Sequence, residues 1–206
     1  MSPLRPRPWQ GRDGRWPMPD AAMDELAEVF DGGRLRLVDT PWWARTTLAA
    51  SQLQDPERRA RLVAALDRVA DVAGEVEVRV GAWHGDFTPW NMSRHGSRLL
   101  LWDWERFETG VPHGMDRVHY AVNTIARARG FGVGSVLDGL RAGATGDAEV
   151  DLTVAAAYLA ALATRYLLGA QEDGGEVIAD RADLVLSILS ELTLHLAPVS
   201  QELLQP

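Results

Sequence analysis

Three oxygen-bearing side chains in the middle of the chain have the types and spacing that phosphoryl transfer requires. Asp86 and Asn91 lie in one loop, and Asp103 follows the next apolar segment, 12 residues after Asn91. A reacting hydroxyl needs a carboxylate to orient it and accept its proton, and Mg²⁺ prefers carboxylate and amide oxygens. We therefore expect Asp86 to act as a base and Asn91 and Asp103 to hold a metal ion.

The segments on either side of this loop predict a strand-loop-strand unit. Residues 75–80 alternate strictly between polar and apolar side chains, which is typical of a strand with one buried face. Residues 99–102 (LLLW) indicate a short buried strand, reached through a turn at His95-Gly96. We expect such a unit to bring the loop and Asp103 close together, because the loop connects the two strands and Asp103 directly follows the second one.

The rest of the sequence predicts helices, so we expect a mainly α (α+β) fold. Asp20, Thr40-Pro41 and Asp55-Pro56 are N-cap signals. The expected helices cover residues 20–30, 40–53, 55–74, 114–129, 133–142, 150–170 and 176–196. Residues 1–19 are expected to form a linker or hinge-like lead-in, 20–197 one domain and 198–206 a tail.

Composition excludes several classes of protein. The chain has no cysteine, which rules out disulfides and fits a cytoplasmic protein. Its net charge of −8 argues against nucleic-acid binding. Residues 152–170 are apolar, but Arg165 interrupts them, so we expect a buried helix and no membrane contact. All 21 basic residues are arginine, which indicates a GC-rich bacterial coding bias and excludes any mechanism that needs a lysine.

The motif H-x-D-x-x-x-x-N followed by a strand ending in Asp resembles the catalytic loop and metal-binding Asp of the protein-kinase-like fold. The form present here, HGDFTPWN followed by LLLWDWE, is similar to the aminoglycoside/choline-type phosphotransferase branch. The resemblance implies that Asp86 is the catalytic base, that Asn91 and Asp103 bind the metal, and that His84 supports the loop.

A further element of this family is matched after the catalytic segment. Gly110-Val-Pro112 followed by Asp116 resembles the Gly-x-Pro…Asp element, whose aspartate braces the catalytic loop and opens a helix. The resemblance implies a helical C-terminal lobe that uses ATP and Mg²⁺ to phosphorylate a hydroxyl of a small molecule such as an aminoglycoside, sugar or amino alcohol. The individual acceptor, the residues that bind the nucleotide and the oligomeric state are not evident from the sequence.

The nucleotide-binding lobe of this family is not evident in the sequence. Only 83 residues precede His84, they predict mostly helices, and they contain neither a G-x-G-x-x-G loop nor a lysine. We therefore expect the chain to correspond to the C-terminal lobe. An alternative is a non-catalytic phosphotransferase-like binding module. A metal hydrolase built from His84, Asp86 and Asp103 is a third hypothesis, which lacks a histidine spacing typical of metal ligands.

Structural roles are also open for several of these residues. Asp103 could cap the end of a strand, and Asp116 is expected to act as an N-cap of the following helix. Glu105 could touch a metal indirectly or form a surface salt bridge. The eight tryptophans are expected to lie mostly in the core. The remaining histidines have no ligand spacing and are expected at the surface or partly buried: His95, His113 and His119.

Overall fold

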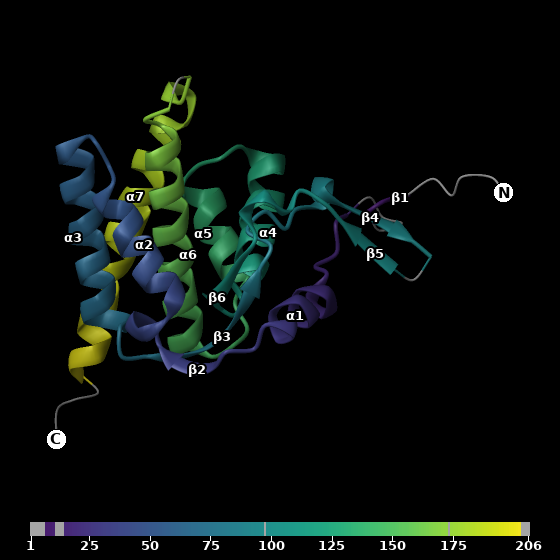
Figure 1. Cartoon of the computed structure of the whole chain (residues 1–206), viewed down its shortest axis with the longest axis horizontal. Helices are drawn as coiled ribbons and strands as arrows, with labels where there is room; N and C mark the ends of the chain where they lie inside the picture. The colour runs from purple at the N-terminus through teal and green to yellow at the C-terminus, as the bar shows by residue number, and fades with distance from the viewer. Residues whose placement is uncertain (1–6, 11–14, 97, 173, 203–206) are drawn as a thin grey trace. The chain divides into compact units, whose positions relative to one another are not determined.

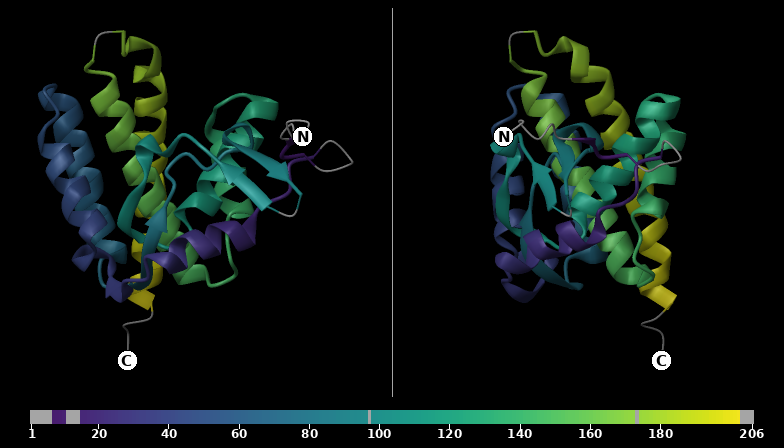
Figure 2. Two further views of the ribbon diagram at one scale, coloured as in Figure 1. Left: turned by 45° about the vertical axis from the view of Figure 1, so that its right-hand side comes forward. Right: turned by 90° about the vertical axis from the view of Figure 1, so that its right-hand side faces the viewer.

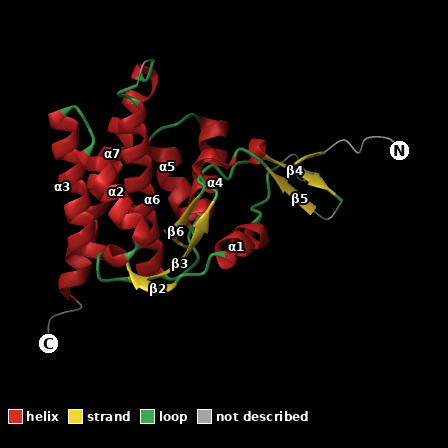
Figure 3. Ribbon diagram, in the orientation of Figure 1, coloured by secondary structure: helices red, strands yellow, loops and turns green. Residues whose placement is uncertain are grey.

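The computed structural model describes residues 7–10, 15–96, 98–172 and 174–202. The chain divides into two compact units, each built from two stretches of sequence (Figure 1). Unit 1 comprises residues 1–32 and 80–145, and unit 2 comprises residues 33–79 and 146–206. The described residues form seven α-helices and six short strands, so the mainly helical α+β class is confirmed (Figure 3).

Unit 1 combines three helices with short antiparallel strands. Its first sheet has the order β1-β4-β5, and the hairpin of β4 and β5 pairs Met92 with Leu101. Helices α4 and α5 pack side by side (Figure 2), and a Cβ on Gly139 of α5 would lie 2.5 Å from the Cα of Val122 in α4. The elements are β1 (Arg7–Pro8), α1 (Asp20–Val29), β4 (Met92–His95), β5 (Arg98–Leu101), β6 (Glu108–Pro112), α4 (Met115–Arg129) and α5 (Val133–Ala142).

Strand β3 (Glu77–Trp83) leads directly into the candidate catalytic loop. It pairs antiparallel with β6, with a register shift between Gly81 and Ala82, in a sheet of order β2-β3-β6 with β2 at Gly33–Arg36. The prediction of a strand at 75–80 is correct, but the observed strand begins two residues later, at Glu77, and continues to Trp83. Its last four residues are all buried, so the alternation ends where the strand enters the core.

Unit 2 contains four helices and the short strand β2. The helices are α2 (Pro41–Ser51), α3 (Pro56–Ala73), α6 (Ala148–Gly169) and α7 (Glu176–Glu202). Helix α6 packs against α7 (Figure 2) and against α2 and α3. The predicted caps are confirmed: Thr40 Oγ1 accepts from the backbone N–H of Trp43, and the Asp55 carboxylate accepts from the N–H groups of residues 57 and 58.

Helix α6 is long and apolar enough to cross a membrane by length and composition. In the structure 67% of its apolar window is buried inside the protein. This is the placement of a core helix, and it agrees with the burial expected for residues 152–170.

Two expectations about individual residues are wrong. Asp20 is the first residue of α1 and not its cap. The carbonyl of Pro19 accepts the first N–H groups of the helix, and the Asp20 carboxylate instead pairs with Arg117. The tryptophans are also less buried than expected: Trp42 and Trp83 are buried, three are partly buried and three are exposed. Within the predicted linker, residues 7 and 8 form strand β1, and residues 1–6 and 11–14 lie outside the described residues.

The core of unit 1 lies directly under the candidate loop. Phe87 from the loop packs with Met23 of α1, Met92 of β4 and Tyr120 of α4. The Tyr120 hydroxyl donates a 2.9 Å hydrogen bond to the carbonyl of Pro17, and this bond ties the segment before α1 to α4. The loop therefore rests on packed side chains contributed by three elements.

Burial raises the pKa of Tyr120 to about 12. Because the folded state disfavours the phenolate, Tyr120 stabilises the fold fully below about pH 10, and this contribution is lost as pH rises towards about 12. We expect the wild-type free energy of unfolding to fall over this window by up to about 2–3 kcal/mol more than that of Tyr120→Phe. The chain has no lysine or cysteine, so few other groups titrate there. Urea unfolding at several pH values measures the difference, and parallel curves for the two proteins would contradict the assignment.

Candidate active site

The backbone of the loop after β3 is held by one buried carboxylate from α4. Asp116 accepts hydrogen bonds from the N–H of His84 at 2.6 Å and from the N–H of Gly85 at 3.1 Å. Asp116 is the second residue of α4, whose N-cap is Gly114, so the expected N-cap role is wrong. Its side chain points to the loop instead, which agrees with the bracing that the family resemblance implies.

Gly85 must be glycine for two reasons. Its φ of +77° lies in the left-handed region, and a Cβ there would collide with the backbone carbonyl of Arg106. The tight turn at Gly85 lets His84 point inward while Asp86 points to a partly exposed position. The glycine of the His-Gly-Asp motif thus has a steric explanation.

His84 is fully buried and uses both ring nitrogens in hydrogen bonds. Nδ1 accepts from the N–H of Asp86 at 3.2 Å, and Nε2 donates to the carbonyl of Trp102 at 3.0 Å. These bonds require the neutral ring with its proton on Nε2. Burial lowers the pKa of His84, although the Trp102 carbonyl and Asp86 oppose that shift. His84 therefore supports the loop, and it has no free nitrogen for the metal-hydrolase hypothesis.

The carboxylate of Asp86 is held by one donor at each oxygen. The side-chain amide of Asn91 donates to Oδ2 at 2.8 Å and also to the Asp86 carbonyl at 3.1 Å. Nε2 of His119 lies 3.1 Å from Oδ1. The side chain of Asp86 is 28% exposed, which leaves the remaining lone pairs accessible to a reacting hydroxyl.

The electrostatic surroundings keep Asp86 ionised. Burial raises the pKa of this carboxyl, but His119, the Asn91 amide and the nearby Arg106 outweigh it and hold the pKa below its ordinary value. An ionised carboxylate in hydrogen-bonding reach of a hydroxyl is the form that a general base requires.

Asp103 stands beside this loop in an unusual backbone conformation. Trp102, the residue before it, is held at both backbone groups: its N–H donates to the Asn91 carbonyl at 3.2 Å, and its carbonyl accepts from His84. Among the described residues, Asp103 is the one non-glycine residue with positive φ, at 66°. Its exposed carboxylate has no hydrogen bond or ion pair within the described part of the chain. Glu105 is exposed and pairs with Arg106 at 3.4 Å, in agreement with the surface role considered for it.

The structure thus joins four of the five predicted site residues in one hydrogen-bonded network and places Asp103 next to it. The four are His84, Asp86, Asn91 and Asp116. No group of three or more His, Asp or Glu side chains suited to a metal occurs in the described ranges. Mg²⁺ needs only one or two protein carboxylates, and an amide oxygen can complete the protein's share. The donor set of Asn91 and Asp103 is of that kind.

Sequence reasoning missed His119 and Asn123. His119 was expected at the surface or partly buried, but it is 5% exposed and contacts Asp86. Asn123 donates from Nδ2 to the His119 carbonyl at 2.9 Å. The available signal was the spacing of Asp116, His119 and Asn123, which puts all three on one face of a helix.

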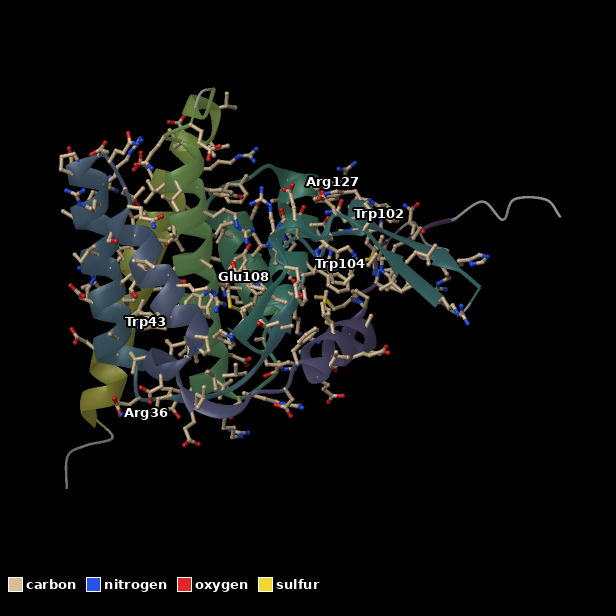
Figure 4. The ribbon with its side chains drawn as sticks, in the orientation of Figure 1. Arg36, Trp43, Trp102, Trp104, Glu108 and Arg127 are labelled. Atoms are coloured by element: carbon tan, nitrogen blue, oxygen red, sulfur yellow. The ribbon has the colours of Figure 1, made fainter. Side chains whose placement is uncertain are left out.

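Aromatic side chains surround the loop, several of them exposed. The rings of His84 and Trp104 lie 4.6 Å apart, and the His84 and Phe87 rings 5.8 Å apart. Trp102 and Trp104, both labelled in Figure 4, are 44% and 45% exposed, and they precede and follow Asp103 in the sequence. The guanidinium of Arg127 lies over Trp90 at 5.1 Å. Packing in the core, the role expected for most of the tryptophans, does not account for such exposure.

An open groove of about 1170 Å³ adjoins the site within unit 1. Phe87 and Trp104, the neighbours of Asp86 and Asp103, form part of its lining. Pro17, Met18 and residues of α1 also line it, and Leu99 and Leu101 of β5 contribute apolar surface.

Comparisons with protein-family models, curated proteins and solved structures find no match for this chain. The sequence motif and the geometry of the loop are therefore the features of the chain that bear on its function. Both belong to residues of unit 1.

Proposed function

We propose that this chain is the catalytic lobe of an ATP-dependent phosphotransferase of the aminoglycoside/choline type, with the protein-kinase-like fold. One observation carries the proposal: Asp86 is ionised, partly exposed and held by Asn91, in a loop whose backbone is fixed by Asp116. Hydrogen bonds thus hold the residues of the H-x-D-x-x-x-x-N motif in one loop and leave the Asp86 carboxylate accessible to a hydroxyl, as such a mechanism needs.

The proposed reaction moves one phosphoryl group. Asp86 orients the acceptor hydroxyl and takes its proton, the oxygen forms a bond to the γ-phosphorus of ATP, and the bond to the β-phosphate oxygen breaks to release ADP. Asn91 and Asp103 would hold Mg²⁺, which neutralises phosphate charge when bound. The acceptor is a small molecule with a hydroxyl group, such as an aminoglycoside, sugar or amino alcohol.

Two features of the site support this assignment of ligands. The Asp103 carboxylate is exposed and unpaired within the described residues, and positive φ at a non-glycine residue is a form of backbone strain often found at functional sites. Aspartate tolerates this region better than most residues, so the strain is modest. The groove beside Phe87 and Trp104 offers apolar and aromatic surface suited to a nucleoside base. Any cation that the chain itself supplies to the phosphates is an arginine, because it has no lysine.

Titration calorimetry with Mg-ATP tests the proposal without knowledge of the acceptor. We expect the wild-type chain to bind Mg-ATP in the millimolar range or tighter, and Asp103→Asn to weaken binding at least about tenfold, since one metal ligand loses its charge. Asp138→Asn, which changes a surface carboxylate paired with Arg129 and Arg141, is the matched control and should bind as the wild type does. No heat of binding at millimolar nucleotide would contradict the proposal and favour a non-catalytic binding module.

A further inference from the structure

One face of α4 contacts both the backbone and the reacting side chain of the loop. Asp116, His119 and Asn123 follow the spacing i, i+3 and i+7, so they line up along the helix. Asp116 holds the N–H groups of His84 and Gly85, and His119 reaches the Asp86 carboxylate one turn further on. A single rigid helix therefore determines where the loop lies and how its carboxylate is turned.

The carboxylate of Asp86 needs such support because its own torsion does not fix it. Rotation about the bond to a terminal carboxylate is broad, with no sharp staggered minima. Asn91 holds Oδ2 from within the loop, and His119 is the described side chain that reaches Oδ1. Two donors on different oxygens fix the plane of the group, whereas one donor leaves it free to swing.

The chemistry of the contact assigns the proton to His119. An ionised carboxylate can only accept, so Nε2 of His119 carries hydrogen and donates to Oδ1. Asn123 lies beside the ring and donates from Nδ2 to the His119 carbonyl; because Nε2 is itself a donor, the 3.1 Å contact between Nδ2 and Nε2 is not a hydrogen bond. The side chain of His119 is only 6% exposed, so water does not compete for this bond as it would at the surface.

We propose that His119 is a positioning residue for Asp86, holding the carboxylate in the orientation that receives the proton of the acceptor hydroxyl. The inference rests on the proposed function. Small misplacements of a reacting group are costly, and a shift of about 1 Å can lower a rate about 100-fold. His119 acts through Asp86 and is not one of the groups proposed to hold the metal or the nucleotide, so its loss should lower kcat and leave nucleotide binding nearly unchanged.

Kinetics of ADP formation tests this role with two variants of His119. Mg-ATP is supplied with a mixture of aminoglycosides, amino alcohols and sugars. We expect His119→Ala to lower kcat at least about tenfold while KM for Mg-ATP stays within about twofold. His119→Gln should recover part of kcat, because its side-chain amide N–H can donate to Asp86. His113→Gln, the same change at a histidine that pairs with Asp24 of α1, serves as the control. Wild-type kcat in His119→Ala, or equal losses in the Ala and Gln variants, would overturn the proposal.

Nuclear magnetic resonance of the ring nitrogens separates failure of this inference from failure of the proposed function. In wild-type protein we expect Nε2 of His119 to be protonated and its resonance to move in Asp86→Asn but not in Asp138→Asn. If the wild type forms no ADP although the His119 resonance responds to Asp86→Asn, the phosphotransferase proposal fails. The contact between His119 and Asp86 then exists without a catalytic role, so the positioning proposal is overturned as well. If ADP forms but the His119 resonance ignores Asp86→Asn, the positioning proposal alone is overturned.

Discussion

Asp86→Asn is expected to lower phosphate transfer from Mg-ATP by about 10²–10⁴-fold, the usual contribution of a positioned general base. The asparagine side chain has nearly the same shape but cannot accept the hydroxyl proton at neutral pH. One of its two donors, Asn91 or His119, still has the remaining oxygen as acceptor, and Asp116 still holds the loop backbone, so the loop should keep its conformation. The measurement is ADP release with the same mixture of hydroxyl compounds, together with urea unfolding to show that the fold persists.

The matched control for this substitution is Asp138→Asn on α5. It makes the same chemical change at an exposed position whose partners are Arg129 and Arg141. We expect its activity and stability to lie close to those of the wild type. Unchanged activity in Asp86→Asn would exclude Asp86 as the base, and equal losses in both variants would show that the effect is not specific to the loop.

The largest effect on stability is expected at Asp116. Replacing it with alanine leaves the N–H groups of His84 and Gly85 without their acceptor in a buried region. Each unsatisfied buried donor costs about 1–3 kcal/mol, so we expect a total loss of about 2–5 kcal/mol in the free energy of unfolding. Urea unfolding followed by both circular dichroism and tryptophan fluorescence measures the loss and shows whether the two probes report one transition.

Asp138→Ala on α5 provides the comparison for this prediction. Its carboxylate is exposed and its ion pairs are solvated, so its removal should cost less than about 1 kcal/mol. Hydrogen exchange adds local detail, since the amides of His84 and Gly85 should exchange much faster in Asp116→Ala. A loss no larger than that of Asp138→Ala would contradict the role of Asp116 as the brace of the loop.

The helices were predictable because their signals are local. Thr40-Pro41 and Asp55-Pro56 combine a capping side chain with a proline at the first helical position, and both helices begin where expected. The helix predicted at 133–142 has those bounds in the structure. Asp20 misled the prediction, because a carboxylate next to Pro19 has the form of a cap but pairs with Arg117.

The short strands were harder to predict because their pairing is not local. Strand β6 (Glu108–Pro112) contains a glycine and a proline, which favour a turn, and it is held by pairing with β3 nearly 30 residues away. Strand β1 has only two residues, and its partner is β4. Such elements depend on the surrounding fold more than on their own propensity.

The site was predictable as far as the motif extends along the chain. The spacing of His84, Asp86 and Asn91 was enough to predict that they lie in one loop, where hydrogen bonds connect them. His119 lies 33 residues beyond Asp86, and nothing local to a single histidine on a helix reveals that it meets a loop carboxylate. The exposed tryptophans beside Asp103 were missed because large aromatic residues are usually buried.

The most direct test of the central claim, that this loop binds a metal-nucleotide complex for phosphate transfer, uses Mn²⁺-ATP as a paramagnetic probe in nuclear magnetic resonance. Mn²⁺ prefers oxygen ligands as Mg²⁺ does and broadens the signals of nearby groups. We predict that the Asn91 side-chain amide and the Asp103 backbone amide broaden first, before Gly139 in the same unit, and that Asp103→Asn removes this selectivity. Broadening that spares Asn91 and Asp103 in the wild-type protein would contradict the account.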